Sequence, residues 1–154
     1  MTASPSAPTK RATTDPAAMA ARLRLSATRL ARILRRHADT GLSPSQLAAL
    51  ATVDLHGPMT LGALAEHERV APPSITKVVT KLEADGLLAR EADPRDRRVA
   101  VVSLTPEGTA LLAASRRRKN QWLNARLQRL DADERARLAN ALDVIEKIIS
   151  QDQP

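Results

Sequence analysis

The chain has 154 residues, enough for one compact domain that buries a hydrophobic core. It contains 24 Lys and Arg against 17 Asp and Glu, so its formal net charge of +7 suits a polyanionic partner. The sequence has no cysteine and no apolar run near the ~18 residues that span a bilayer, which excludes disulfides, thiolate metal sites, cysteine nucleophiles and a transmembrane helix.

The beginning of the chain differs in composition from the rest. Ser, Thr, Pro and Ala dominate residues 1–14 without periodic apolar positions, and we expect a disordered tail there. This segment also lacks the apolar core of a secretory signal, so we expect a soluble cytoplasmic protein. Asp15 and Pro16 then form a typical helix start, and apolar residues recur at helical spacing to about His37.

Two shorter helices are predicted next. Residues 43–46 match a capping box with a proline in its first turn. The apolar positions of the helix that follows are Leu47, Leu50, Ala51 and Leu55. After a Gly-Pro break, Thr60 can cap a third helix that ends near Glu68.

A fourth helix begins at Pro72 and Pro73 and is strongly amphipathic. The residues expected to face the core are Ile75, Val78, Val79 and Leu82. The residues on the opposite, polar and cationic face are Ser74, Thr76, Lys77, Thr80 and Lys81. The paired prolines remove two backbone donors from the end of a helix that could otherwise hold a phosphate. Gly86 is expected to end the helix.

A hairpin and two longer helices complete the predicted fold. Two extended runs, Leu87–Glu91 and Arg98–Leu104, flank a charged, turn-prone segment and predict a β-hairpin with a basic tip. Thr105 starts a long helix that is expected to end at Leu130. Asp131 begins a capping box for the last helix, whose apolar seam is Leu138, Leu142, Ile145 and Ile149. The predicted fold class is mainly α with a small β-hairpin wing.

These elements together are typical of a DNA-binding domain. An α-helix fits the major groove, where Ser, Thr and Lys side chains reach base edges and phosphates, while a basic loop can lie along a neighbouring groove. The only aromatic residue is Trp122, so base stacking of single strands is unavailable. Duplex DNA is therefore the expected polyanion.

Within residues 61–108, the amphipathic helix is followed by an E-x-D-G-L turn, a D-P-x-D-R-R loop and an L-T-x-x-G helix start. In this order the motifs resemble the MarR (multiple antibiotic resistance regulator) family of winged helix-turn-helix repressors, and the resemblance extends from about 16 to 150. It implies a homodimer in which 16–40 and 105–150 are dimerisation helices and 42–104 is the winged helix-turn-helix DNA-binding domain.

The resemblance also assigns roles to individual residues. The polar face of the fourth helix would contact the major groove, and the wing would be formed by Arg95, Arg97 and Arg98. Asp96 would orient Arg98 through a charge-assisted hydrogen bond. Without the family pattern, the same residues read as a solvated surface with a weak ion pair.

A regulated repressor is the function that the resemblance implies: a dimer that binds a palindromic operator and that a small aromatic or phenolic anion releases. The candidate ligand-binding residues, near the expected junction of the dimer arms and the DNA domain, are Arg36, His37 and His56. We expect no cofactor and no metal, because the histidines have no ligand spacing beyond Glu66-His67-Glu68, whose neighbours point in different directions.

Other interpretations remain open at the level of sequence. A sequence-indifferent architectural DNA-binding protein would use the same charge with little specific affinity. A helical interaction module would bind an acidic protein with the basic hairpin. An enzyme finds little support, because the sequence has no nucleophile elbow and no phosphate-binding glycine loop. The arginine-rich runs at 22–36 and 116–119 could contact phosphates or form solvated faces.

Overall fold

The computed structural model describes residues 15–38, 40–93, 96 and 98–151. The chain divides into two units, which comprise residues 1–37 and 38–154 and are described separately.

The described part of the first unit, from residue 15 onward, contains one helix, α1 (Pro16–Ala38), whose last residue belongs to the second unit. The carboxylate of Asp15 accepts hydrogen bonds from the backbone N–H groups of Ala17 and Ala18, both at 3.3 Å. This N-cap, with Pro16 as the first helical residue, confirms the predicted helix start. The tail predicted over 1–14 lies outside the described residues.

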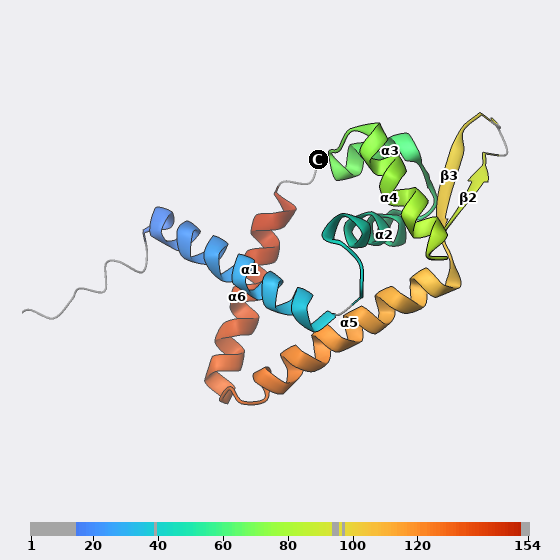
Figure 1. Cartoon of the computed structure of the whole chain (residues 1–154). Coiled ribbons are helices and arrows are strands. Elements are labelled where there is room, and N and C mark those ends of the chain that lie inside the picture. The colour runs from blue at the N-terminus through green and yellow to red at the C-terminus, as the bar shows by residue number, and fades with distance from the viewer. Residues whose placement is uncertain (1–14, 39, 94–95, 97, 152–154) are drawn as a thin grey trace, which may run out of the picture. The chain divides into compact units, whose positions relative to one another are not determined.

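The second unit carries all the other elements, and Figure 1 shows a short hairpin beside a group of helices. In chain order these elements are α2 (Pro44–His56), β1 (Met59–Thr60), α3 (Leu61–Glu68), α4 (Pro72–Ala84), β2 (Leu88–Ala92), β3 (Ala100–Leu104), α5 (Pro106–Leu127) and α6 (Ala132–Ser150). This mainly helical architecture with a small wing confirms the predicted fold class.

Side-chain caps determine where the helices begin. The Ser43 hydroxyl accepts a hydrogen bond from the N–H of Gln46, and the Gln46 side chain accepts one from the N–H of Ser43, so the predicted capping box is complete. Thr60, Thr105 and Asp131 cap α3, α5 and α6 through their side-chain oxygens. Each cap confirms the start predicted from the sequence.

The three strands form an antiparallel sheet in the order β1-β3-β2. Strand β2 pairs with β3 from Leu88 opposite Leu104 to Ala92 opposite Ala100. The predicted hairpin is confirmed, although each strand begins one or two residues later than expected. Strand β1 was not predicted, because a two-residue strand has no pattern of its own and exists only through its pairing with β3.

One apolar cluster joins the three short helices, the sheet and the start of α5. Its buried members are Ala49, Leu50, Val53, Leu64, Ala65, Ile75, Val79, Leu82, Leu87, Leu88, Val102 and Leu112. Each fully buried Leu, Ile or Val side chain stabilises the fold by about 1.5–3 kcal/mol. The predicted inward face of the fourth helix is confirmed by its three residues in this cluster.

Two sequence-based expectations are wrong in detail. Leu55, expected on the inner face of α2, is 78% exposed, and Val53 is buried in its place. Helix α5 ends at Leu127 rather than Leu130. The N–H of Gln128 still donates four residues back, to Asn124, but those of Arg129 and Leu130 donate three residues back, to Arg126 and Leu127. The α-helix therefore tightens and stops before the extended N-cap of α6.

Candidate nucleic-acid interface

A tight turn joins α3 to α4. Arg69 takes the left-handed backbone conformation, with φ of 53°, and its N–H donates to the carbonyl of Glu66 at 3.1 Å. The N–H of Val70 donates to the carbonyl of Ala65 at 3.0 Å. These bonds satisfy the last carbonyls of α3 and allow α4 to start at Pro72, so the two helices form a helix-turn-helix.

One face of α4 is buried and the other is open to solvent. Ile75, Val79 and Leu82 are 2% exposed or less. The structure places all five predicted groove-facing residues on the exposed side: Ser74, Thr76, Lys77, Thr80 and Lys81. Helix α4 thus exposes hydroxyl and ammonium groups to solvent on one face and packs into the apolar core with the other.

The polar side chains of α4 differ in whether they already form hydrogen bonds or ion pairs within the protein. The Thr76 hydroxyl donates to the carbonyl of Pro72 at 2.9 Å. The Lys81 ammonium lies 2.8 Å from a carboxylate oxygen of Asp85, an exposed pair of little energetic value. Among the described residues, the Lys77 side chain has no hydrogen-bond or ion-pair partner. Lys77 is therefore the cation of this face that is available to a phosphate or a base edge.

The N-terminus of α4 offers little to an anion. Its N-cap, Ala71, has no side-chain capping bond, and Pro72 and Pro73 have no N–H groups. The N–H groups of Ser74 and Ile75 already point to the carbonyl of Ala71, at 2.9 and 3.3 Å. Recognition by α4 must therefore come from side chains.

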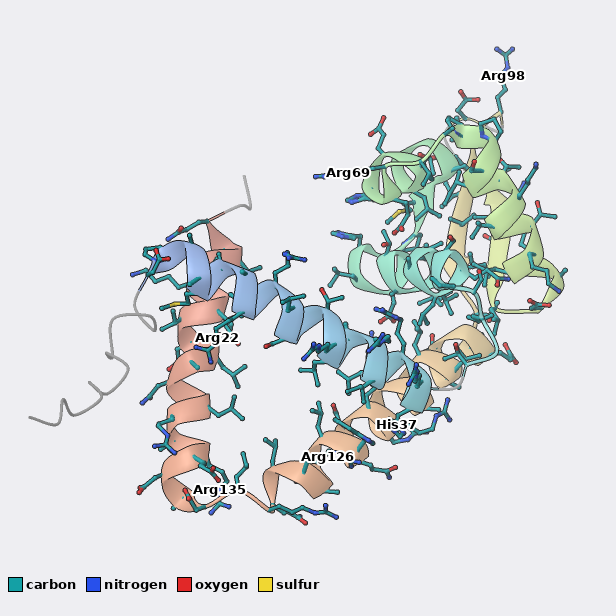
Figure 2. The ribbon with its side chains drawn as sticks, turned by 60° about the vertical axis from the view of Figure 1, so that its left-hand side comes forward. Arg22, His37, Arg69, Arg98, Arg126 and Arg135 are labelled. Atoms are coloured by element: carbon teal, nitrogen blue, oxygen red, sulfur yellow. The ribbon has the colours of Figure 1, made fainter. Side chains whose placement is uncertain are left out.

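The hairpin loop presents Arg98 to solvent, and Figure 2 shows this side chain projecting beyond the end of the hairpin. The Asp96 carboxylate accepts a hydrogen bond from the backbone N–H of Arg98 at 3.0 Å, and the Asp96 carbonyl accepts one from Val99 at 2.9 Å. The observed bonds of Asp96 thus shape the turn that carries Arg98. Arg95 and Arg97 lie outside the described residues.

The base of the wing depends on two glycines of the quoted motifs. Gly86 has φ of 71° and ends α4. The Thr105 hydroxyl donates to the carbonyl of Gly86 at 2.7 Å and accepts from the N–H of Gly108 at 3.0 Å. A Cβ at Gly108 would lie 2.2 Å from the carbonyl oxygen of Leu87, which no side chain tolerates. Helix α5 therefore packs directly on the backbone of Leu87, just before β2.

Sequence reasoning missed one ion pair that connects the reading helix to the wing. A guanidinium nitrogen of Arg90, on β2, lies 2.7 Å from a carboxylate oxygen of Glu83, on α4. Both side chains are less than one-third exposed, so solvent screens this pair less than a surface pair. Nothing local in the sequence signals the contact, because it depends on how the hairpin folds back on α4.

The predicted ligand-binding residues belong to different units. Arg36 and His37 are exposed in the last turn of α1, and His56 is the last residue of α2. The ring of His56 stacks on that of His67, with centroids 4.4 Å apart and an interplanar angle of 29°. A shared site for the three residues stays a prediction.

Part of the basic run in α5 is engaged within the protein. Arg116 forms an ion pair with Asp54 of α2. The Nε of Arg118 donates to the carbonyl of Ala38 at 2.6 Å. These contacts attach α5 to α2 and to Ala38, the first residue of the second unit, and they give both arginines a structural role.

The described part of the chain contains neither a metal-binding cluster nor a membrane-spanning helix. No group of three or more His, Asp or Glu side chains is arranged to hold a metal ion. No helix between residues 15 and 151, within the described ranges, is long and apolar enough to cross a membrane.

Known proteins with similar sequences are transcriptional regulators. An uncharacterized HTH-type transcriptional regulator of Mycobacterium leprae is 44% identical over 136 residues, which cover 88% of this chain and 95% of that protein. The HTH-type transcriptional repressor MdtR of Bacillus subtilis is 40% identical over 68 residues, 44% of each chain. A solved putative transcriptional regulator of Pseudomonas aeruginosa shares 35% identity with a TM-score of 0.77, covering 86% of this chain and 94% of that one.

The sequence model of the MarR family matches residues 42–100, which contain the helix-turn-helix and strand β2 and end at the first residue of β3. This family and the similar proteins are regulators, so the enzyme interpretation is wrong. The chain belongs to the MarR family and is a DNA-binding transcriptional regulator with a winged helix-turn-helix.

Proposed function

We propose that the protein is a homodimeric repressor of the cytoplasm, in which two copies bind a palindromic operator and a small aromatic anion releases them. The observation that carries the DNA-binding mode is the exposed Ser, Thr and Lys face of α4 above its buried apolar back. Each base pair presents a distinct pattern of donors and acceptors in the major groove, so short polar side chains on an inserted helix supply sequence specificity.

Each part of the interface has its own task in this proposal. In α4, the groove-facing residues are Ser74, Thr76, Lys77, Thr80 and Lys81. In the wing, the phosphate-binding or minor-groove residues are Arg95, Arg97 and Arg98. Asp96 positions Arg98 by holding its backbone N–H. The Arg90–Glu83 pair keeps the wing in register with α4, so that both reach one duplex.

Exposed apolar residues support the proposal of a dimer. Helix α6 has 19 residues and none is buried. Its exposed large apolar side chains are Leu138, Leu142, Val144, Ile148 and Ile149, and those of α1 are Met19, Leu23, Leu25 and Leu30. Such rows mark association surfaces, since most of a helix's stability in a protein comes from packing of its apolar face. We propose that a second copy of the chain buries these apolar side chains. In this dimer, residues 16–40 and 105–150 are the dimerisation helices and residues 42–104 are the DNA-binding domain.

A two-fold symmetric dimer explains why the operator is proposed to be palindromic. Two reading helices related by the symmetry axis contact two identical half-sites, about 34 Å or one helical turn apart. The repressor role is supported by the similar segment of the B. subtilis protein, which is named a repressor. An anion bound by Arg36, His37 and His56 would change the spacing between the two reading helices.

The first experiment measures binding of the purified protein to DNA upstream of its own gene and to a scrambled duplex, over a series of salt concentrations. A preference of about a thousandfold or more is the expected result for a sequence-specific regulator. Equal and steeply salt-dependent binding to both duplexes would leave the architectural interpretation instead. Addition of benzoate as a test anion should weaken operator binding, and unchanged affinity at saturating benzoate contradicts release by an anion.

A further inference from the structure

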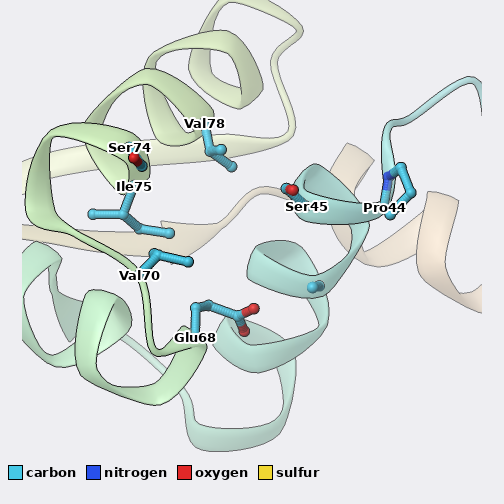
Figure 3. A pocket seen from close by; sticks show the side chains of 8 residues that line it. Pro44, Ser45, Glu68, Val70, Ser74, Ile75 and Val78 are labelled. Carbon is cyan, nitrogen blue, oxygen red and sulfur yellow. The ribbon is translucent and has the colours of Figure 1, made fainter.

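A cavity of about 340 Å³ lies within the second unit, between the start of α2 and the helix-turn-helix. Figure 3 shows its lining side chains, which come from α2 on one side and from the end of α3, the α3–α4 turn and α4 on the other. The eight lining residues are Pro44, Ser45, Ala48, Glu68, Val70, Ser74, Ile75 and Val78. The volume suits a small organic molecule.

The wall of the cavity is mainly apolar, and its polar groups are few. Val70, Ile75 and Val78 form the apolar side that faces α2. Ser45 and Ser74 contribute hydroxyl groups. This combination of an apolar wall and a few polar groups is typical of sites that bury a ligand's hydrocarbon body and orient its polar end.

The only charged residue of the lining is Glu68, although the chain as a whole carries a net charge of +7. One carboxylate oxygen of Glu68 accepts a hydrogen bond from the Thr52 hydroxyl, which holds the side chain in place. Among the described residues, Glu68 has no ion-pair partner. A carboxylate that is held at an apolar wall and has no cation of the described residues beside it is a suitable partner for a cationic ligand.

We propose that this cavity binds a small apolar ammonium ion, whose charge pairs with Glu68 and whose hydrocarbon body packs on Val70, Ile75 and Val78. The charge of the site disfavours an anion, so this ligand differs in class from the aromatic anion proposed above. Because Ser74, Ile75 and Val78 belong to α4, the bound cation also alters the reading helix directly. Binding of the cation does not depend on the proposed repressor function, whereas its effect on DNA does.

The test uses three fluorescent probes with the same ring and different charges: 1-naphthylmethylammonium, the neutral 1-naphthylmethanol and the anionic 1-naphthoate. Fluorescence anisotropy is measured while the full-length protein is titrated into each probe without DNA. The ammonium should bind saturably and at least tenfold more tightly than the neutral alcohol. Equal affinity for these two probes, or no saturable binding of the ammonium, would overturn the proposal.

Three variants locate the site. Glu68→Gln keeps an acceptor for Thr52 but removes the charge, and it should reduce ammonium affinity to that of the neutral alcohol. Glu66→Gln removes the same charge from an exposed position outside the cavity and should bind like wild type. Ala48→Leu fills part of the cavity and should weaken all binding there. Equal loss in Glu66→Gln and Glu68→Gln would show attraction by general charge and refute the site.

The effect on DNA is measured separately, with operator duplex and the ammonium probe. The wild-type protein should lose affinity for DNA as the probe saturates, and the Glu68→Gln protein should not. The Glu68→Gln protein also corrects for direct binding of the cation to the duplex. If the probe binds without any change in DNA affinity, the cation site stands, but the proposal that the cation weakens DNA binding through α4 is refuted.

Discussion

Replacing Gly108 with alanine tests whether the close approach of α5 to Leu87, just before β2, builds the base of the wing. The added Cβ would lie 2.2 Å from the carbonyl oxygen of Leu87 and 2.8 Å from a methyl carbon of Leu104. The first obstacle is backbone, which cannot rotate away as a side chain can. To increase the distance between the Cβ and this oxygen to 3.0 Å, the lower limit for real Cβ contacts, α5 or the Leu87 backbone must move by about 0.8 Å.

The expected cost follows from what that displacement breaks. Overpacking of a filled core costs about 1–3 kcal/mol. The Leu87 carbonyl accepts from the N–H of Thr105 at 3.2 Å, and the Thr105 hydroxyl donates to the carbonyl of Gly86 at 2.7 Å. A shift of α5 lengthens both bonds, each worth about 1 kcal/mol. With each bond weakened by about half, Gly108→Ala should destabilise the protein by about 2–4 kcal/mol.

Gly62→Ala is the matched control. Gly62 lies within α3 with ordinary helical φ, and its added Cβ would meet nothing nearer than the Thr60 hydroxyl at 3.8 Å. The same substitution should here stabilise the protein by about 0.5–1 kcal/mol, because alanine loses less backbone entropy in a helix. Urea denaturation followed by circular dichroism measures both variants at one protein concentration, since dimerisation makes stability depend on concentration. If Gly108→Ala is as stable as wild type, the close approach of α5 to Leu87 is wrong.

Four further changes test the proposed interface and the dimer. If Lys77 contacts a base, Lys77→Ala should weaken operator binding by about 1–3 kcal/mol and relax the sequence preference at one base pair per half-site. A uniform loss of affinity over all sequences would instead make Lys77 a phosphate contact. The control Lys147→Ala, which makes the same change of charge on α6, should lose far less affinity. Arg98→Ala should reduce the slope of log affinity against log salt by about two per dimer, and an unchanged slope removes Arg98 from the interface. Leu142→Asp should shift the mass measured by light scattering from two copies to one, and a retained dimer excludes this part of α6 from the interface. Ser43→Ala should lower stability by about 1 kcal/mol in urea denaturation through the lost cap of α2, and no change would show that water replaces it.

Local features explain which parts of the fold could be predicted. The caps at Ser43, Thr60, Thr105 and Asp131 depend on residues three positions apart, so the sequence contains all the information they need. The inner face of α4 was predictable because its apolar and polar residues separate cleanly onto two sides.

Helix α2 shows where periodicity stops being informative. Apolar residues occupy most positions from Leu47 to Leu55, so the sequence offers more than one apolar stripe. Packing against α3, α4 and β3 selects Ala49, Leu50 and Val53 for the core and leaves Leu55 exposed. Strand β1 likewise depends on a partner about 40 residues away in the chain. Such choices belong to tertiary structure and have no local signal.

The same limit applies to the cavity. The sequence presents Glu66 and Glu68 as equivalent acids on either side of His67. Helical geometry turns adjacent residues in different directions, and only the folded chain shows that Glu68 faces α2 and lines the cavity while Glu66 is exposed. The candidate site therefore depends on the packing of two segments that are separate in sequence, residues 44–48 and 68–78.

The two proposed ligands would act on DNA binding by different physical routes. An anion between the dimer arms and the DNA domain changes the distance between two reading helices, so it matters only where both half-sites must be bound at once. A cation beside Glu68 contacts α4 itself, so its effect is contained within one chain. A duplex with a single half-site distinguishes the two routes, because only one reading helix binds it and the distance between the two helices does not affect affinity. On that duplex an anion that acts through spacing leaves affinity unchanged, whereas the cation still weakens the contact that each α4 makes with its own groove.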